Sequence, residues 1–156
     1  MGNLDDLYKE IILDHYRSPR NRGELPTPPA VRAEGFNPLC GDEITVYLDV
    51  RDGVLSDIKV SGHGCSISQS SSSLMSAAVK GRSVQEARDK IDMFKQLMTA
   101  HASTLEANAD AVTTDLRKLG EIAALQGVVK FPVRIKCATL AWNTLSQALD
   151  EVTTEP

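Results

Sequence analysis

The chain has 156 residues, 42% of them apolar and 24% charged, with a formal net charge of −4. These values are typical of one soluble globular domain that is long enough to bury a core. The modest acidic balance argues against nucleic-acid binding through a basic face and against attraction to an anionic membrane. No apolar run approaches the roughly 20 residues needed to span a bilayer. The first residues are acidic where a signal peptide needs positive charge, so we expect a cytoplasmic protein.

Apolar residues at helical spacing predict a first helix from about Leu4 to Tyr16, with Asn3 as its N-cap. Ser18-Pro19 should end this helix, because proline cannot continue it. Residues 20–29 are polar and rich in proline, which favours an extended connector near the N-terminus. We therefore expect residues 1–30 to form a helix and a mobile connector within one domain, residues 1–156.

The next stretch combines a thiol and a carboxylate. Pro38 and Gly41 both disfavour regular structure, so we expect Cys40 and Asp42 to lie on a tight loop. A thiolate and a carboxylate that face one point suit a metal ion. They could equally be an exposed nucleophile and its neighbour.

A β-hairpin follows this loop. Alternating apolar residues predict strands at about 44–50 and 55–60, joined by an Asp-Gly turn at 52–53, and a short strand at about 30–34 should add an edge. Cys40 precedes the first strand of the hairpin and Cys65 follows the second. Because these two ends lie side by side in an antiparallel pair, we expect the two thiols to be neighbours.

Residues 66–79 are rich in serine, a composition that is typical of a linker. Apolar residues nevertheless recur on one helical face and small side chains allow close packing, so we favour a helix from about Ser66. Cys65 would then lie at a helix N-terminus, where the dipole favours the thiolate.

Three further segments complete the chain. Ser83 and Glu86 form a capping box that predicts a helix to about Thr104. A short helical piece is expected at about 116–125, followed by an extended segment at 128–132 and a last helix at 133–152.

Cys40, Cys65 and Cys137 are the only cysteines, an odd number that does not suit a disulfide framework. Two of them stand at breaks in regular structure, where a merely space-filling cysteine is less expected. The residues alone leave two readings open, a shared metal or reactive site and three unrelated buried thiols.

The three cysteine contexts together resemble a known family. Asn37-Pro38-Leu39-Cys40-Gly41-Asp42, Gly64-Cys65-Ser66-Ile67-Ser68 and the run from Phe131 to Trp142 are similar to the IscU/NifU-N family of iron–sulfur cluster assembly proteins, and within it to the SufU branch. The resemblance covers nearly the whole chain. It implies an α+β fold, a small three-stranded antiparallel sheet with helices packed on one side. It also implies a SufU-type insertion in roughly residues 84–115.

The same resemblance implies a metal site made from Cys40, Asp42, Cys65 and Cys137. Scaffold-type members carry a histidine immediately before the third cysteine, where this chain has Lys136, and this difference favours Zn²⁺ over a labile cluster. Arg134 and Lys136 could offset the formal charge of −2 on such a site.

The implied role is that of a zinc-bound sulfur acceptor, which takes persulfide sulfur from a SufS-type cysteine desulfurase on Cys40. Such a protein is sulfurtransferase-like and activates its partner, rather than being a stand-alone enzyme. SufBCD-type scaffold proteins are further candidate partners downstream. The alternative within the family is a scaffold that assembles and transfers a [2Fe–2S] cluster, or holds iron, on Cys40, Cys65 and Cys137.

A third reading, from another class, makes Cys40 a hydrolytic nucleophile that needs a histidine base. The candidates are His15, His63 and His101. We expect His63 to be a surface residue at a strand end, with ligation in place of Asp42 as the competing idea. His15 and His101 are expected on helix surfaces, and Trp142 in the core.

Overall fold

The computed structural model describes residues 4–27, 29–38, 41–103 and 120–154. Three antiparallel strands form one sheet in the order β1-β2-β3, namely β1 (Val31–Asn37), β2 (Asp42–Arg51) and β3 (Val54–His63). The predicted hairpin and its edge strand are therefore confirmed. Along β2 the side chains of Ile44, Val46 and Leu48 are buried, as the alternating pattern requires when one face of a sheet is covered.

The turn between β2 and β3 has the geometry that its sequence demands. Asp52 and Gly53 have φ angles of 55° and 76°. Two consecutive positive φ values define the tight turn whose twist matches that of a hairpin, and the Asp-Gly pair adopts it readily. This turn places the start of β2 beside the end of β3.

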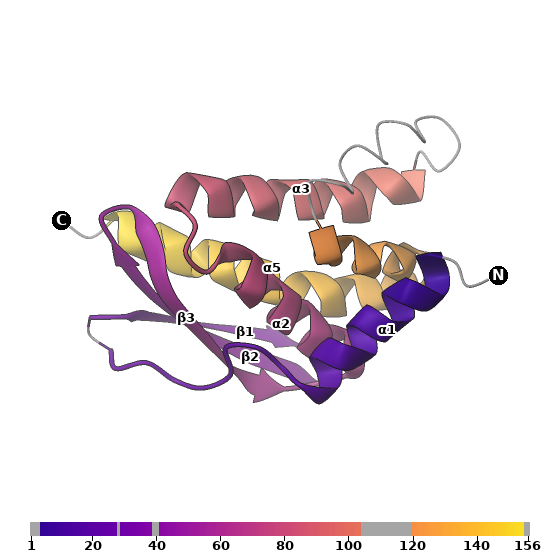
Figure 1. Ribbon diagram of the computed structural model, residues 1–156, viewed down its shortest axis with the longest axis horizontal. Helices are drawn as coiled ribbons and strands as arrows, with labels where there is room; N and C mark the ends of the chain where they lie inside the picture. Colours follow the sequence, from indigo (N-terminus) through magenta and orange to yellow (C-terminus); the bar gives the residue numbers. More distant parts are fainter. Residues whose placement is uncertain (1–3, 28, 39–40, 104–119, 155–156) are drawn as a thin grey trace.

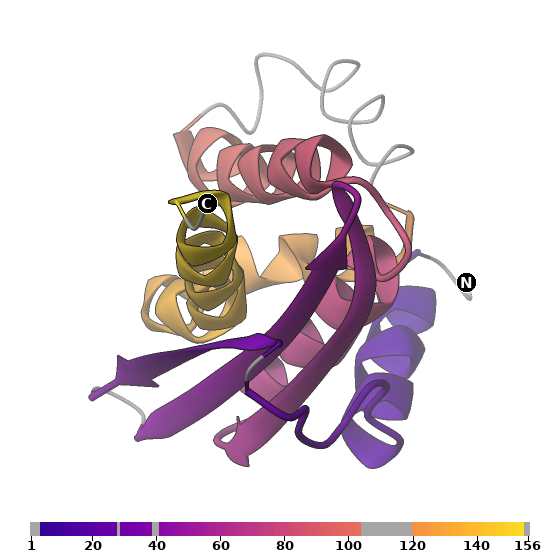
Figure 2. The same ribbon diagram turned by 90° about the vertical axis from the view of Figure 1, so that its left-hand side faces the viewer.

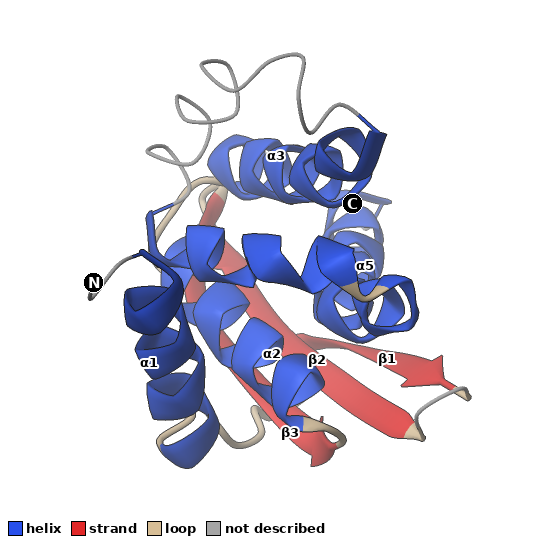
Figure 3. Cartoon of the chain, turned by 90° about the vertical axis from the view of Figure 1, so that its right-hand side faces the viewer, coloured by secondary structure: helices blue, strands red, loops and turns tan. Residues whose placement is uncertain are grey.

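The described part of the chain contains five helical segments, and they lie on one side of the sheet (Figure 1), as Figures 2 and 3 show from either end. They are α1 (Leu4–Arg17), α2 (Ser66–Val79), α3 (Val84–Ser103), the 3₁₀ segment η1 (Gly120–Lys130) and α5 (Pro132–Thr154). α2 and α5 pack against the sheet, α1 packs on α2, and α3 lies on the far side of these helices. Among the described residues, none of these helices has the apolar length needed to cross a bilayer. The predicted insertion at roughly 84–115 comprises α3 and residues outside the described ranges, so it stays a prediction.

Trp142 lies at the centre of the core, as predicted. Its indole is fully buried and stacks on Phe94, with ring centroids 4.5 Å apart and an interplanar angle of 15°. The indole N–H donates to Ser71 Oγ at 2.9 Å, and the Ser71 hydroxyl donates to the Ala138 carbonyl at 2.6 Å. A buried tryptophan needs such a partner for its N–H. The chain of bonds ties α2 to α5.

The serine-rich segment is a helix whose polar side chains face inward, so the linker reading is wrong. Six of its serines are buried: Ser68, Ser70, Ser71, Ser72, Ser73 and Ser76. Four of these hydroxyls donate to backbone carbonyls of α1, α2, α5 and the connector after α1, and a fifth contacts a histidine of α1. Small side chains also let the neighbouring segments approach α2 closely.

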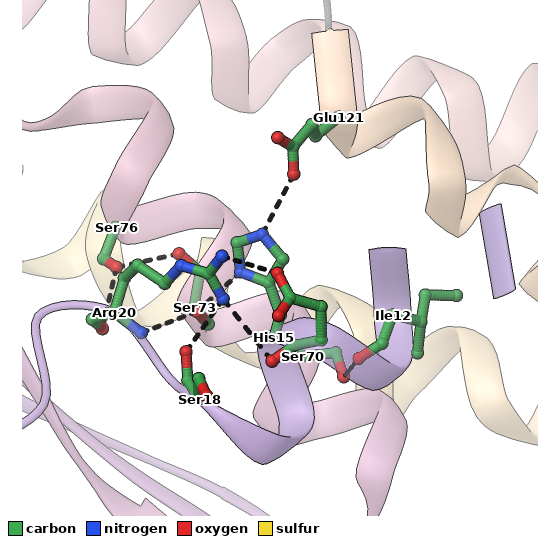
Figure 4. A network of polar contacts seen from close by, with 9 residues as sticks. Ile12, His15, Ser18, Arg20, Ser70, Ser73, Ser76 and Glu121 are labelled. Carbon is green, nitrogen blue, oxygen red and sulfur yellow. Dashed lines mark hydrogen bonds and ion pairs between the residues drawn. The ribbon is translucent and has the colours of Figure 1, made fainter. Parts of the chain in front are cut away.

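His15 is buried, with 3% of its surface exposed, so the expectation that it lies on a helix surface is wrong. Its Nδ1 lies 2.7 Å from Ser73 Oγ and its Nε2 lies 3.0 Å from Glu121 Oε2 (Figure 4). Because a carboxylate only accepts, the proton belongs on Nε2 and Nδ1 accepts from Ser73. The hydroxyl of Ser73 in turn accepts from the Arg20 backbone N–H at 2.8 Å. This polar network joins α1, α2 and η1.

The same network anchors the end of α1. The Arg20 guanidinium donates to Asp14 Oδ2 at 2.6 Å, and this hydrogen bond is the main reason that the pKa of Asp14 is lowered. Arg20 also donates to the Ser18 carbonyl at 2.8 Å. These contacts hold the chain where it leaves the helix.

The connector after α1 runs beside β3. The Val60 N–H donates to the Asn21 carbonyl at 2.9 Å, and the Gly23 N–H donates to the Val60 carbonyl at 3.1 Å. Arg22 donates to Gln69 on α2 at 2.7 Å and to the Gly62 carbonyl. The connector therefore ties the end of β3 to α2.

The segment before α5 differs from the prediction. The extended stretch expected at 128–132 is the end of η1, which continues to Lys130. The Phe131 N–H donates to the Val128 carbonyl at 2.9 Å, a local bond that satisfies both backbone groups without a strand partner. Gly127 therefore does not end the helical segment, and residues 116–119 of the predicted helix lie outside the described part of the chain.

Candidate metal centre

Asp42, Cys65 and Cys137 come together although they are far apart in the sequence. One ligand atom from each, a carboxylate oxygen and two sulfurs, lies within 4.8 Å of the others. Asp42 is the first residue of β2, Cys65 is the N-cap of α2, and Cys137 lies in the second turn of α5. The arrangement is that of a site built where a sheet and two helices converge.

Strand pairing brings the first two of these residues together. In the β2–β3 ladder Glu43 is opposite His63, so the residues just before β2 and just after β3 are neighbours. The structure accordingly has Cys65 beside Asp42, with the Cys65 N–H 2.9 Å from Asp42 Oδ1. The hairpin argument was made for Cys65 and Cys40; Cys40 lies outside the described residues, so that neighbourhood stays a prediction.

Asp42 is fully buried, and it was expected on a loop. It is instead paired with Asn37 across the β1–β2 ladder, which fixes its backbone. Asp42 Oδ1 accepts from the Cys65 N–H at 2.9 Å, and Oδ2 accepts from Asn37 Nδ2 at 3.3 Å. Both carboxylate oxygens are therefore held by N–H donors, which fix the orientation of the carboxylate.

The two thiols have different surroundings. Cys65 is half-buried, and its Sγ accepts from the Ser68 N–H at 3.4 Å in the first turn of α2. The predicted position at a helix N-terminus is confirmed. Cys137 is fully buried, and its Sγ lies 3.6 Å from Asn37 Nδ2.

Two glycines make room for this cluster. A Cβ on Gly64 would lie 2.5 Å from Asp42 Oδ1, so a side chain there would displace the carboxylate. Gly62 has a φ of +122°, and a Cβ there would lie 2.2 Å from the Glu43 carbonyl oxygen. Glycine is needed at both positions because the chain passes so close to β2.

The donor set suits a thiophilic cation. Zinc is held by four ligands, and thiolate with carboxylate is an accepted combination. In a tetrahedron with zinc–ligand distances near 2.0–2.3 Å, ligand atoms are about 3.3–3.8 Å apart. The three described ligand atoms lie within 4.8 Å of one another, so small movements would close the cluster around the ion.

The histidines lie elsewhere. The His63 side chain is 73% exposed, and its Nε2 lies 3.6 Å from Glu43 Oε2, as expected of a surface residue at a strand end. Among the described residues, the ligand group contains no histidine. His101 lies within α3, and its side chain is not among those that the structure describes. His15 belongs to the network with Ser73 and Glu121.

The basic residues near Cys137 are exposed. Arg134 and Lys136 both lie in the first turns of α5 with their side chains toward solvent. A role for Arg134 as a charge partner of the site stays a prediction.

Asn37 is the residue that sequence reasoning missed. It occupies an inward-facing position of β1, in step with Ala33 and Gly35, and it is 4% exposed. The available signal in the sequence was a polar residue at a strand position where the alternating pattern requires an apolar one. The role of Asn37 follows only from the side chains that it contacts in the structure.

A three-stranded sheet covered by helices on one side, with a carboxylate and two thiols gathered at its end, defines a small α+β protein with a candidate metal centre. Residues 7–138 match the model of the NifU-like N terminal domain. The chain belongs to this family, and the resemblance seen in its motifs is confirmed.

Two similar proteins agree with this family assignment. The zinc-dependent sulfurtransferase SufU of Bacillus subtilis is 40% identical over 148 residues, which is 95% of this chain and 92% of the relative. The iron–sulfur cluster assembly scaffold protein IscU of Streptococcus pyogenes is 37% identical over 149 residues, 96% of this chain and 86% of the relative.

A solved structure shows the same architecture. The putative iron–sulfur cluster assembly scaffold protein for the SUF system from Fervidobacterium islandicum superimposes with a TM-score of 0.75 at 32% identity. The match covers 90% of this chain and 94% of that one. The predicted fold class is therefore confirmed.

Proposed function

We propose that this protein is a zinc-bound sulfur acceptor in iron–sulfur cluster assembly, working in the cytoplasm with a SufS-type cysteine desulfurase. The observation that carries the proposal is the convergence of Asp42, Cys65 and Cys137 within 4.8 Å. Cys40 would be the fourth ligand. The B. subtilis relative is named a zinc-dependent sulfurtransferase, which supports this reading.

Covalent geometry supports including Cys40. Cys40 is two residues before Asp42, and a chain of that length spans about 7 Å at most between Cα atoms. Asp42 is itself fixed by its pairing with Asn37. The thiol of Cys40 is thus tethered to the cluster, whichever conformation residues 38–41 take.

The proposed transfer is balanced without an oxidant or reductant. The Cys40 thiolate attacks the outer sulfur of the persulfide on the desulfurase cysteine. A new S–S bond forms on Cys40, the S–S bond of the donor breaks, and the donor cysteine leaves as a thiolate. Cys40 then carries the persulfide for delivery to SufBCD-type scaffold proteins.

Bound zinc would keep the cysteines deprotonated and ordered, and it is redox-inert. The protein supplies the rest of the site. The N–H groups of Cys65 and Ser68 face the carboxylate and one sulfur, and both come from the rigid start of α2. Three thiolates and one carboxylate against Zn²⁺ leave a formal charge of −2, which Arg134 and Lys136 would offset.

Metal analysis on protein prepared without added iron tests the proposal. We expect about one zinc per chain, and we expect the Cys40→Ala variant to lose stimulation of a matched desulfurase. Stimulation that survives in this variant would exclude Cys40 as the acceptor.

A second function, a scaffold for a [2Fe–2S] cluster, uses the same ligands. The S. pyogenes relative is named an assembly scaffold, and thiolates also suit iron–sulfur clusters. Stoichiometric iron with a charge-transfer spectrum would favour this function. In a scaffold, Asp42→Ala should trap the cluster, so a variant that stays colourless after reconstitution would count against it.

A further inference from the structure

Asn37 places an amide donor between two of the candidate ligands. It is the last residue of β1 and pairs directly with Asp42, the first residue of β2. Its side chain is buried, at 4% exposure, on the side of the sheet that faces α5. A buried amide must find hydrogen-bond partners, and here those partners decide its role.

The contacts of Asn37 point into the cluster. Nδ2 donates to Asp42 Oδ2 at 3.3 Å and to Cys137 Sγ at 3.6 Å, within the range of an N–H···S bond. An amide nitrogen carries two N–H groups, so it can serve both acceptors at once. Asn37 thereby links a ligand on the sheet to a ligand on α5.

We propose that Asn37 is a positioning residue of the metal centre, which holds Asp42 and Cys137 in the arrangement that a metal ion needs. The inference rests on the proposed function in one respect, that the cluster binds a metal. An amide that donates to both atoms at once limits their separation and their orientation. It keeps the carboxylate oxygen and the sulfur close before the cation binds.

Two other donors among the described residues serve different atoms of the cluster. The Cys65 N–H serves Asp42 Oδ1, and the Ser68 N–H serves Cys65 Sγ. Both are backbone groups at the start of α2, so they connect the ligand on the sheet to the ligand on α2. Asn37 supplies the corresponding connection from the sheet to α5.

An ordinary structural role makes a different prediction. Asparagine before a proline commonly shapes a turn by bonding to nearby backbone. An asparagine that only shaped the turn or filled space would affect folding but leave the zinc affinity of the folded protein unchanged. Zinc affinity and the spectrum of a bound metal therefore separate the two roles.

The test uses two variants that remove the amide donor. Asn37→Ala also removes most of the side-chain volume, whereas Asn37→Leu keeps it. Zinc dissociation constants are measured by competition with a chromophoric chelator, and Co²⁺ serves as a spectroscopic probe. We expect zinc binding to weaken about 10- to 100-fold in both variants, the usual effect of losing such a partner. We also expect the sulfur-to-cobalt charge-transfer bands to shift.

Thr144→Val is the matched control, because Thr144 is also buried and donates to the Leu140 carbonyl at 2.8 Å, away from the ligands. It should lower stability but leave zinc affinity and the cobalt spectrum unchanged. Asn37 variants that fold and match the wild type in both metal measurements would overturn the proposal.

If the Asn37 variants fail to fold, NMR spectroscopy of the wild-type protein provides the test. The side-chain amide resonances of Asn37 should move when zinc is added, because their acceptors become metal ligands. Resonances that stay in place while zinc binds would overturn the proposal. A wild-type protein that binds no zinc would instead refute the proposed function, so the two failures can be told apart.

Discussion

Asp42 connects three parts of the chain through one buried carboxylate. It pairs with Asn37 on β1, accepts the Cys65 N–H from the start of α2, and lies within 4.8 Å of a sulfur on α5. A carboxylate this enclosed would be costly without its donors. Its surroundings therefore have to remain free of any atom that would push it aside.

Gly64→Ala should damage the site for this reason. The new Cβ would lie 2.5 Å from Asp42 Oδ1, and the carboxylate must move. We expect zinc affinity to fall by about tenfold or more, as when a ligand loses its support. Equilibrium competition with a chelator measures the change.

Gly53→Ala is the control for this substitution. Gly53 has a φ of +76° with open space around it, so alanine there costs about 1–2 kcal/mol of backbone strain but leaves the cluster alone. Zinc affinity that falls equally in both variants, or in neither, would contradict the role given to Gly64.

Single residues show where sequence reasoning succeeds and fails. The hairpin pattern was sufficient to predict that Cys65, just after β3, lies beside the start of β2, because strand pairing follows from local patterns. The burial of His15 and the role of Asn37 could not be predicted in this way. Both depend on which side chains of distant segments face them.

At the scale of elements, α2 is the segment against which much of the molecule is assembled. It is the helix with the polar interior, and its buried hydroxyls reach α1, the connector and α5. Ser73 alone serves both His15 Nδ1 and the Arg20 N–H. The stability of the end that carries the candidate metal centre depends on this helix, since Cys65 caps it.

Ser73→Ala should lower the free energy of unfolding by about 1–3 kcal/mol, because it leaves a buried imidazole nitrogen and a backbone N–H without their partner. Urea unfolding followed by circular dichroism measures the effect. Ser66→Ala, at an exposed position of the same helix, should change it by less than about 0.5 kcal/mol. Equal midpoints for the two variants would show that the network contributes nothing.

Elements with strong local signals were predictable and weakly patterned ones were not. The Asp-Gly turn and the Ser83–Glu86 capping box appear in the structure as expected, with Glu86 N–H donating to Ser83 Oγ at 3.1 Å. The 3₁₀ segment η1 was expected to give way to extended chain after Gly127. Short apolar runs do not distinguish a strand from a tight helix, and here tertiary packing makes the choice.

On the scale of the whole molecule, the candidate ligands join parts that would otherwise be held by packing alone. A cation bound to Asp42, Cys65 and Cys137 would tie the sheet to α2 and to α5. Binding to the folded state then adds directly to stability, because the unfolded chain has no such site.

Removing the metal should therefore lower the melting temperature. At a free zinc concentration 100 times the dissociation constant, binding contributes about 2.7 kcal/mol, which corresponds to about 5–11 °C for a domain of this size. Differential scanning calorimetry with and without a chelator measures the difference. A melting temperature that chelation leaves unchanged would contradict metal binding at this cluster.

Mass spectrometry of the protein after incubation with a SufS-type desulfurase and cysteine tests whether sulfur is transferred to Cys40. We predict that the peptide containing Cys40 gains the mass of one sulfur atom, and that a reductant removes this sulfur. No added mass on that peptide, or the same addition in the Cys40→Ala protein, would show that Cys40 is not the sulfur acceptor.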